Sequence, residues 1–371
     1  MMTYKNQPER EMSRRSALAN FLLLAALEYF LIKPYEFWHP RIFEAPFYVY
    51  LGLQCLLHRV GIKSLAKANY SLNHGEIGIA SKYESQLAFD QAYFLPTLLV
   101  RDDVSIEEKF SVILEFVEEH GYPVILKSDV GCVGKGICKI SSLADLQEKI
   151  PLLLGDYIVQ KFTPYTYECG IFYIRYRGKP RITGINKKHF PTVIGNGCDT
   201  LLSLARSHYR YTHHWNSFLQ YLDTNRVPAV GEEVRLSFIG SHTLGCKFTD
   251  DIDLLTPELE TAIFKVFENQ PGFNFGRIDV KSESEEALKA GKFVVIEVNG
   301  VASLPTHMFD PKFNILQAYK IFFEHGKYLV KIACEHKEKS MDLLSYREIL
   351  NRVKANQHML NQVHHQLKDL G

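Results

Sequence analysis

The sequence predicts an α+β fold with a helical region at its N-terminus. Two observations support this prediction. Short apolar stretches are joined by tight, glycine-containing turns, as in antiparallel strand pairs, and helix-like stretches separate these pairs without the strict strand–helix–strand alternation of a parallel sheet. With 371 residues, 46% of them apolar, the chain is long enough for two or three subdomains and a sizeable core.

The expected elements follow one another along the whole chain. Helical patterns occupy residues 16–32, 47–60, 83–94, 105–119, 142–149, 200–207, 257–268 and 342–370. Strand patterns occupy residues 96–100, 122–127, 137–140, 157–162, 170–176, 182–190, 233–238, 243–248, 275–280 and 293–300. The stretches 233–238 and 243–248 read as a strand pair. Ser105 and Glu108 form a capping-box pattern at the start of one helix, and Gly121 marks its end.

Composition excludes several classes of protein. A net charge of +1 gives no support for nucleic-acid binding. The seven cysteines are scattered and contain no CxxC pair, which argues against a disulfide framework and against a zinc site. This cysteine usage fits a reducing compartment, so we expect a cytoplasmic protein.

The N-terminal region is unusually apolar. Residues 17–32 follow Arg14 and Arg15, but they are short for a membrane span and contain Glu28. We therefore expect a buried or interfacial helix, and a helical, aromatic cap on the main body. Peripheral membrane contact through residues 16–60 is the less favoured alternative, because large apolar patches usually mark interaction sites.

The stretch from Phe275 to Gly300 carries the most chemistry. Arg277 and Asp279 alternate on one strand candidate, and Glu297 and Asn299 alternate on the next, so each pair shares one face of its strand. If the strands are neighbours, these groups converge. Mg²⁺ prefers oxygen ligands, usually one or two carboxylates together with substrate phosphates, and arginine suits charge on a transferred phosphoryl group. The stretch predicts a magnesium–phosphate site.

A second constellation lies upstream. Lys127 ends a strand candidate and precedes a turn that contains Gly131, Gly134 and Gly136. Backbone N–H groups of such a turn can approach phosphates. The spacing fits neither a Walker P-loop nor a dinucleotide-binding fingerprint, since a strand follows in place of a helix. A plain glycine-rich hairpin is an equally good interpretation of this turn taken alone.

Two further groups could serve a nucleotide. Gln160, Lys161 and Phe162 close a strand whose backbone can read an adenine edge, and Glu168 can accept hydrogen bonds from ribose hydroxyls. Lys188 ends another strand and can hold a phosphate as a point charge. Taken singly, Glu168 reads as a surface acid and Lys188 as part of a solvated lysine pair.

Taken in order, these residues resemble the ATP-grasp superfamily, and within it the D-alanine–D-alanine-ligase-like carboxylate–amine ligases of a less-characterised bacterial branch. The resemblance spans residues 122–311, and its most specific part is Arg277-x-Asp279 followed by Glu297-x-Asn299. In that branch a Gly-Asp-Gly turn is expected where this chain has Gly195-Asn196-Gly197.

The resemblance implies an ATP-grasp fold, in which two α+β subdomains clamp ATP. It implies an N-terminal cap at residues 1–85, a first subdomain with the glycine-rich lid at 86–160, a second with the metal site at 161–325, and a helical tail at 326–371. The implied reaction makes an acylphosphate from a carboxylate, which an amine then opens to an amide.

The resemblance also assigns roles to the residues already named. Lys127, Lys188 and the glycine turn would hold phosphates, Gln160 to Phe162 the adenine, and Glu168 the ribose. One or two Mg²⁺ ions, with Mn²⁺ as a substitute, would bind the set Asp279, Glu297 and Asn299, and Arg277 would stabilise the acylphosphate as it forms.

Three functions compete on these residues. The first is the ATP-dependent ligase, with small-molecule carboxylate and amine substrates and no nucleic-acid partner. The others are a nucleotide-binding scaffold without turnover and a small-molecule kinase of the same superfamily. A homo-oligomer is compatible with the sequence. His307 and Asp310 lie in the loop after the metal strand, where they either face an acceptor pocket or serve only the loop.

Overall fold

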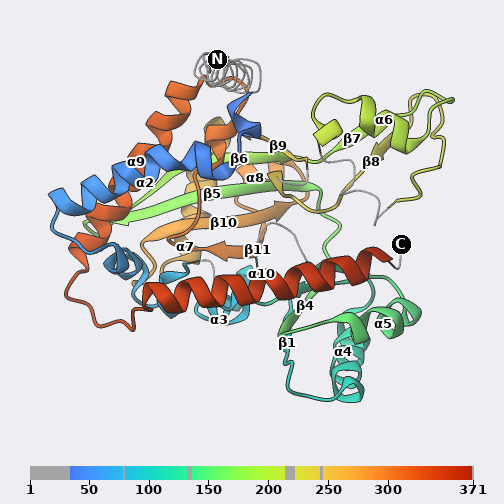
Figure 1. Cartoon of the computed structure of the whole chain (residues 1–371), viewed down its shortest axis with the longest axis horizontal. Helices are drawn as coiled ribbons and strands as arrows, with labels where there is room; N and C mark the ends of the chain where they lie inside the picture. The colour runs from blue at the N-terminus through green and yellow to red at the C-terminus, as the bar shows by residue number, and fades with distance from the viewer. Residues whose placement is uncertain (1–33, 78–79, 132–135, 214–221, 243–244, 370–371) are drawn as a thin grey trace, which may run out of the picture.

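The computed structural model describes residues 34–77, 80–131, 136–213, 222–242 and 245–369. Its centre is an antiparallel sheet of five strands, in the order β11-β10-β5-β6-β9 (Figure 1). The strands are β5 (Tyr167–Tyr176), β6 (Lys179–His189), β9 (Lys247–Asp250), β10 (Phe275–Ser282) and β11 (Val294–Asn299). As predicted, the strands that carry Arg277 and Glu297 are direct neighbours.

Helices α7 (Pro257–Val266) and α8 (Glu285–Lys289) pack on one face of this sheet. Alternate residues of the strands point to that face, so that Ile171, Tyr173 and Ile278 share a core with Leu259 and Ile263 of α7. All five of these side chains are buried, and they remove a large apolar area from water.

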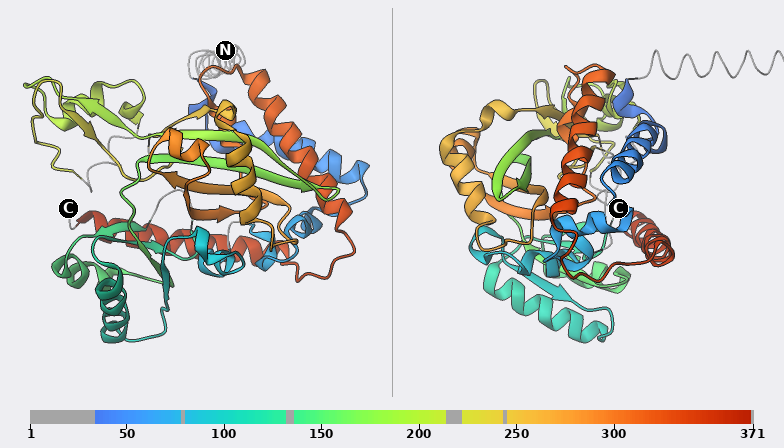
Figure 2. Two further views of the ribbon diagram at one scale, coloured as in Figure 1. Left: turned by 180° about the vertical axis from the view of Figure 1, so that it is seen from behind. Right: turned by 90° about the vertical axis from the view of Figure 1, so that its left-hand side faces the viewer.

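Two long helices cover another side of the sheet. These are α2 (Pro40–Leu57) and α9 (Ile315–Glu335), which Figure 2 shows side by side. The rings of Phe47 and Phe322 stack at a centroid distance of 3.8 Å. Gly326 permits this approach, because a Cβ there would lie 2.7 Å from the Phe47 ring. Pro40 begins α2 at a position where its missing N–H costs nothing.

A second sheet has four strands in the order β1-β4-β2-β3. They are β1 (Thr97–Val100), β2 (Val124–Ser128), β3 (Ile137–Ile140) and β4 (Tyr157–Lys161). Helices α4 (Ile106–His120) and α5 (Leu143–Lys149) bury Ile113, Val117 and Leu146 against it. The Ser105 side chain caps α4 by accepting from the Glu108 N–H, and Gly121 ends it with a φ of +77°.

The remaining elements connect or extend these two layers. Helix α3 (Lys82–Leu87) contacts both β1 and β11. A small excursion contains α6 (Leu201–Ser207), β7 (Thr192–Ile194) and β8 (Glu233–Arg235). The last helix, α10 (Tyr346–Asp369), lies across both sheets' subdomains as a single rod (Figure 1).

Three details of the expected element map are wrong. The stretches 233–238 and 243–248 do not pair with each other: β8 pairs with β7, and β9 completes the larger sheet beside β6, because each meets its partner across a long connection. The helix expected at residues 83–94 ends at Leu87, since a short turn around Gln91 follows. Helix α9 is absent from the expected element map.

The predicted α+β fold class is confirmed by this mixture of antiparallel sheets and helices. The division into four regions stays a prediction. The apolar stretch 17–32 lies outside the described residues. Among the helices that the structure describes between residues 34 and 369, none combines the length and the apolar content of a membrane span.

Candidate active site

A cavity of about 590 Å³ lies between the two sheets. Strands β2 and β4 form one wall, and β5, β6, β10 and β11 form the other. Its lining includes all the site residues predicted from the sequence except Gly134, which lies outside the described residues, and Gly136. Residues far apart in sequence therefore meet in one place, at a volume typical of small-molecule sites.

The floor of the cavity is the β10–β11 pair. In its antiparallel register Arg277 lies opposite Asn299 and Asp279 lies opposite Glu297, and the register shifts immediately after Asp279. All four side chains line the cavity. The period of two that selected these residues thus places them on one face, as expected.

A chain of buried ion pairs covers this floor. Arg277 donates from Nε to Asp279 Oδ1 at 2.6 Å and from Nη2 to Oδ2 at 3.1 Å. Lys188 Nζ bridges Asp279 Oδ2 at 3.1 Å and Glu168 Oε1 at 2.7 Å. Lys281 Nζ lies 3.5 Å from Glu168 Oε2. Three cations therefore share two carboxylates, which leaves positive charge for an anionic ligand.

These ion pairs determine the protonation states of Lys188 and Asp279. Burial alone would lower the pKa of Lys188, but Asp279 and Glu168 raise it above its usual range. Burial alone would raise the pKa of Asp279, but Arg277 and Lys188 hold it below its usual range. Both groups therefore stay charged near neutral pH.

Two glycines make room for these contacts. A Cβ at Gly170 would lie 2.9 Å from Arg277 Cδ and 3.1 Å from Asp279 Oδ1. A Cβ at Gly240 would lie 2.9 Å from Lys188 Cδ and closer still to Glu168 Oε1. Only glycine permits such close backbone approach to the charged side chains.

Lys127 links the two sheets. Its Nζ donates to Gln160 Oε1 at 3.2 Å and to the Ile296 carbonyl at 3.1 Å. Burial lowers the pKa of Lys127 to about 8, although nearby Glu297 opposes the shift. The ammonium lacks a directly bonded carboxylate among the described residues, so a phosphate would be its natural counter-ion.

The predicted adenine strand lies at the opposite wall. Gln160 Nε2 donates to Thr97 Oγ1 at 3.1 Å. The backbone N–H groups of Lys161 and Phe162 donate to the carbonyls of Pro96 and Pro123, at 2.9 and 3.3 Å. Apolar side chains beside this strand give the cavity a slot suited to a flat ring; they are Leu95, Ile125, Ile137, Phe162 and Phe238.

The described ends of the glycine turn are held from two sides. Lys82 Nζ donates to the Gly131 carbonyl at 2.6 Å. Leu360 of α10 packs on both ends, since a Cβ at Gly131 or Gly136 would lie 3.3 Å from its methyl groups. Gly136 has a φ of +67°, a conformation that other residues rarely adopt.

The polar side chains of the floor differ in how many ion pairs and hydrogen bonds they form. Within the described residues Glu297 forms no ion pair and no side-chain hydrogen bond, and Asn299 Nδ2 is buried without a partner. A carboxylate and an amide with unused oxygen atoms suit Mg²⁺, whose remaining ligands are usually phosphates and water. Among the described residues, no group of three or more His, Cys, Asp or Glu side chains is arranged to hold a metal ion.

Several site residues were not singled out from the sequence. Lys281 continues the alternation of Arg277 and Asp279, and that pattern would have found it. Lys82 and the N-terminal residues Glu36, Trp38 and Phe43 also line the cavity, so the N-terminal region forms part of the site. No local signal marks them, because only the tertiary fold brings them there.

The loop residues His307 and Asp310 serve the loop, and neither lines a described cavity. His307 is buried against the Phe172 ring at 5.1 Å, and Asp310 accepts from the Asp250 N–H at 2.7 Å. The alternative of an acceptor-pocket role is therefore not supported. In the turn at Gly195, Asn196 Oδ1 accepts from the N–H groups of Cys198 and Asp199, and its Nδ2 donates to Asp199 Oδ2 at 2.7 Å, so an amide at position 196 maintains the turn.

Comparison with protein-family models and with curated protein sequences finds no match. Solved structures give distant similarities. One is a D-alanine–D-alanine ligase from Bacillus anthracis, 12% identical, with 69% of each chain covered and a TM-score of 0.39. Another is an N5-carboxyaminoimidazole ribonucleotide synthetase in its ADP complex, 14% identical, with 63% of this chain and 48% of that one covered and a TM-score of 0.37.

A third similarity is to an ATP-grasp ligase bound to a minimal precursor, 10% identical, with 62% of this chain and 55% of that one covered and a TM-score of 0.35. The chain spans about half the length of the synthetase and of this ligase. These neighbours agree with the ATP-grasp resemblance of the sequence. At such TM-scores, however, the likeness carries no argument about this chain's reaction, which has to be argued from its own residues.

Proposed function

We propose that this protein is an ATP- and Mg²⁺-dependent ligase that joins a carboxylate to an amine through an acylphosphate. One observation carries the proposal. A single cavity between the two sheets is lined by Lys127, by Gly131 at the start of the glycine turn, by strand β4 and by the Arg277–Asn299 floor.

Each part of the cavity has a task in this reaction. The apolar slot beside Phe162 takes the adenine ring, and Lys127 and Lys188 take phosphate oxygens. Glu297 and Asn299 would hold the metal with Asp279 beside them. The bound Mg²⁺ would supply charge neutralisation at the phosphates.

The first step transfers the γ-phosphoryl group. A carboxylate oxygen of the substrate bonds to the γ-phosphorus while the bond from that phosphorus to the bridging oxygen breaks, and ADP leaves. Arg277, held by Asp279, lies on the floor, where it would stabilise the charge on the transferred group. Such transfer needs mainly positioning and positive charge from the protein.

In the second step the amine nitrogen bonds to the acyl carbon, inorganic phosphate leaves, and the nitrogen loses a proton. This step needs an acyl group that stays shielded from water until the amine arrives. The position of the cavity between two sheets, with α10 packed on the described ends of the glycine turn, suits that requirement.

One observation favours the scaffold alternative. Asp279 is already paired with Arg277 and Lys188, so this carboxylate needs no metal to compensate its charge. The distinguishing experiment is ADP release with Mg²⁺ across a panel of carboxylates and amines. ADP release that needs both substrates supports ligation. A phosphorylated product without amine indicates a kinase, and ATP binding without turnover indicates a scaffold.

A further inference from the structure

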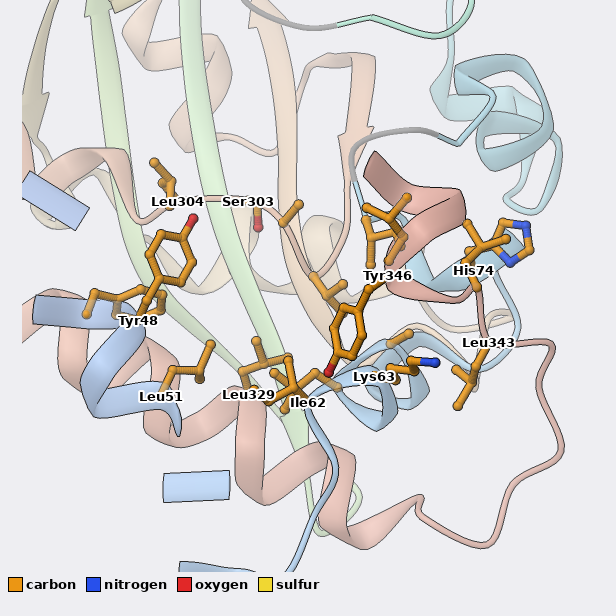
Figure 3. Close-up of a pocket in the computed structure, with 18 of the residues that line it drawn as sticks. Tyr48, Leu51, Ile62, Lys63, His74, Ser303, Leu304, Leu329, Leu343 and Tyr346 are labelled. Atoms are coloured by element: carbon orange, nitrogen blue, oxygen red, sulfur yellow. The ribbon is translucent and has the colours of Figure 1, made fainter. Parts of the chain in front are cut away.

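A second cavity of about 370 Å³ lies beside the first and has no role in the reaction described so far. Figure 3 shows Ser303 and Leu304 along one side, with Leu51, Leu329 and Ile62 opposite and Tyr48 and Tyr346 at the flanks. Its walls come from α2, α9, the start of α10 and the 3₁₀ segment Ile62–Asn69.

The lining of this cavity is predominantly apolar. It includes Phe47, Leu51, Leu65, Ala66, Ile77, Val301, Leu329, Leu343, Leu344 and Ile349. The charged groups lie at the rim and already have contacts: Lys63 Nζ lies 5.0 Å from the centre of the Tyr346 ring, and His74 Nδ1 lies 3.2 Å from the Asp342 carbonyl oxygen. A cavity of about 150 Å³ with an apolar lining holds benzene, so this one has room for a larger apolar group.

The two cavities share one wall. Ala302, Ser303 and Leu304 line both of them, and this segment follows Asn299 of the active-site floor. Hydrogen bonds hold it in place: the Val301 N–H donates to the Gly75 carbonyl at 3.2 Å, and His325 Nε2 lies 2.8 Å from the Ser303 carbonyl. A molecule seated in the apolar cavity therefore lies against a fixed wall of the active site.

One polar group at this wall has no partner. The Ser303 side chain is only 8% exposed, and its Oγ forms no hydrogen bond within the described residues. A buried hydroxyl without a hydrogen bond is unfavourable, so a ligand atom that bonds to it gains from that contact. Ser303 thus offers a polar contact at the boundary between an apolar space and a cationic one.

The charges across the wall decide which end of a ligand points there. The larger cavity is lined by six cationic side chains and five carboxylates, and this excess of one positive charge favours an anionic head group over an ammonium. We infer that the apolar cavity binds the hydrocarbon part of the carboxylate substrate, so that this substrate is an alkyl or aryl carboxylic acid with its carboxylate at Ser303. The inference rests on the proposed ligase function for the identity of the ligand as a substrate.

The probe for this inference is dodecanoate, with hexanoate and acetate as shorter members of the series. Calorimetric titration in the presence of ATP and Mg²⁺ should show affinity that rises with chain length, at best by about fourfold for each methylene group buried. Dodecylamine should bind more weakly than dodecanoate. Stronger binding of the amine, or no binding of dodecanoate at millimolar concentration, would overturn the inference.

Two matched variants separate the cavity from non-specific adsorption. Ile62 lines the cavity and Ile106 lies on α4 away from it, and both side chains are 51% exposed, so an aspartate is tolerable at either position. Ile62→Asp should lower dodecanoate affinity at least tenfold and leave ATP affinity unchanged. Ile106→Asp should change neither affinity. Equal losses in both variants would contradict the proposal.

These titrations, together with measurements of ADP release, distinguish failure of the inference from failure of the proposed function. Dodecanoate binding that depends on Ile62, without ADP release for any amine, would support the apolar site and contradict the ligase function. ADP release with acetate and an amine, without dodecanoate binding, would support the ligase function and contradict the apolar site. Release that is fastest with dodecanoate and slowed by Ile62→Asp supports both.

Discussion

Asp279 and Glu297 lie directly opposite each other on β10 and β11, but their surroundings differ. Asp279 is 3% exposed and holds two cations, whereas Glu297 is half-buried and forms no ion pair within the described residues. Two acids of one motif therefore have different roles. Asp279 organises Arg277 and Lys188, and Glu297 keeps its oxygen atoms available for a ligand.

The largest effect is expected for Asp279→Asn. This change removes the charge that Arg277 and Lys188 share, so both turnover and the free energy of unfolding should fall, the latter by about 3 kcal/mol. Urea unfolding and ADP release measure the two effects. Asp156→Asn is the control, because its ion pair with Arg101 is solvent-exposed and worth less than about 1 kcal/mol. Wild-type stability in Asp279→Asn would contradict its structural role.

Glu297→Gln should separate the two roles. We expect ADP release to fall by about a hundredfold or more, since loss of groups that merely support metal ligands already costs about 10- to 100-fold. The free energy of unfolding should change by less than about 0.5 kcal/mol, as at other sites without packed partners. Glu285→Gln, in a surface pair with Lys289, is the matched control for activity. Unchanged ADP release in Glu297→Gln would remove this acid from the proposed site.

Lys127 should make ATP affinity depend on pH. Its pKa of about 8 lies below the usual value because of burial, and bound phosphates would favour the charged form. ATP affinity should therefore fall above pH 8, by up to about tenfold per pH unit, with proton uptake on binding. Lys127→Met should bind ATP more weakly and lose this slope. Titration calorimetry from pH 6.5 to 9.5 tests this, and an identical slope in both proteins would contradict it.

The smallest effect concerns Glu76, a buried neighbour of Glu297. Burial raises the pKa of Glu76 to about 8, and Glu297 adds to the shift although Lys82 opposes it. The folded state therefore holds a proton that the unfolded chain releases near pH 4.5, so this group makes stability decline as pH rises from 4.5 to 8.

Glu76→Gln removes that ionisation. The variant should be more stable than the wild type at pH 8.5 and nearly equal to it at pH 4.5. Urea unfolding at the two pH values measures the difference. A variant less stable than the wild type at pH 8.5 would show that the hydrogen bond from Ser85 to Glu76 needs the carboxylate itself.

Much of the fold, and the grouping of most candidate site residues, could be predicted from the sequence. The alternation of Arg277 with Asp279 and of Glu297 with Asn299 is local, and the strands obeyed it. The pairing of β9 with β6 was not accessible, because strands so far apart leave no local signal. Nor could the ion-pair role of Asp279 be predicted, since its partner Lys188 comes from another strand and Gly170 leaves room beside Asp279.

Helix α10 runs from the apolar cavity to the described ends of the glycine turn. Tyr346 and Ile349 at its start line the apolar cavity, and Leu360 packs on the ends of the glycine turn. A helix of 24 residues is about 36 Å long and resists bending, so movement at one end is transmitted to the other. The apolar cavity and the described ends of the glycine turn therefore share one rigid support.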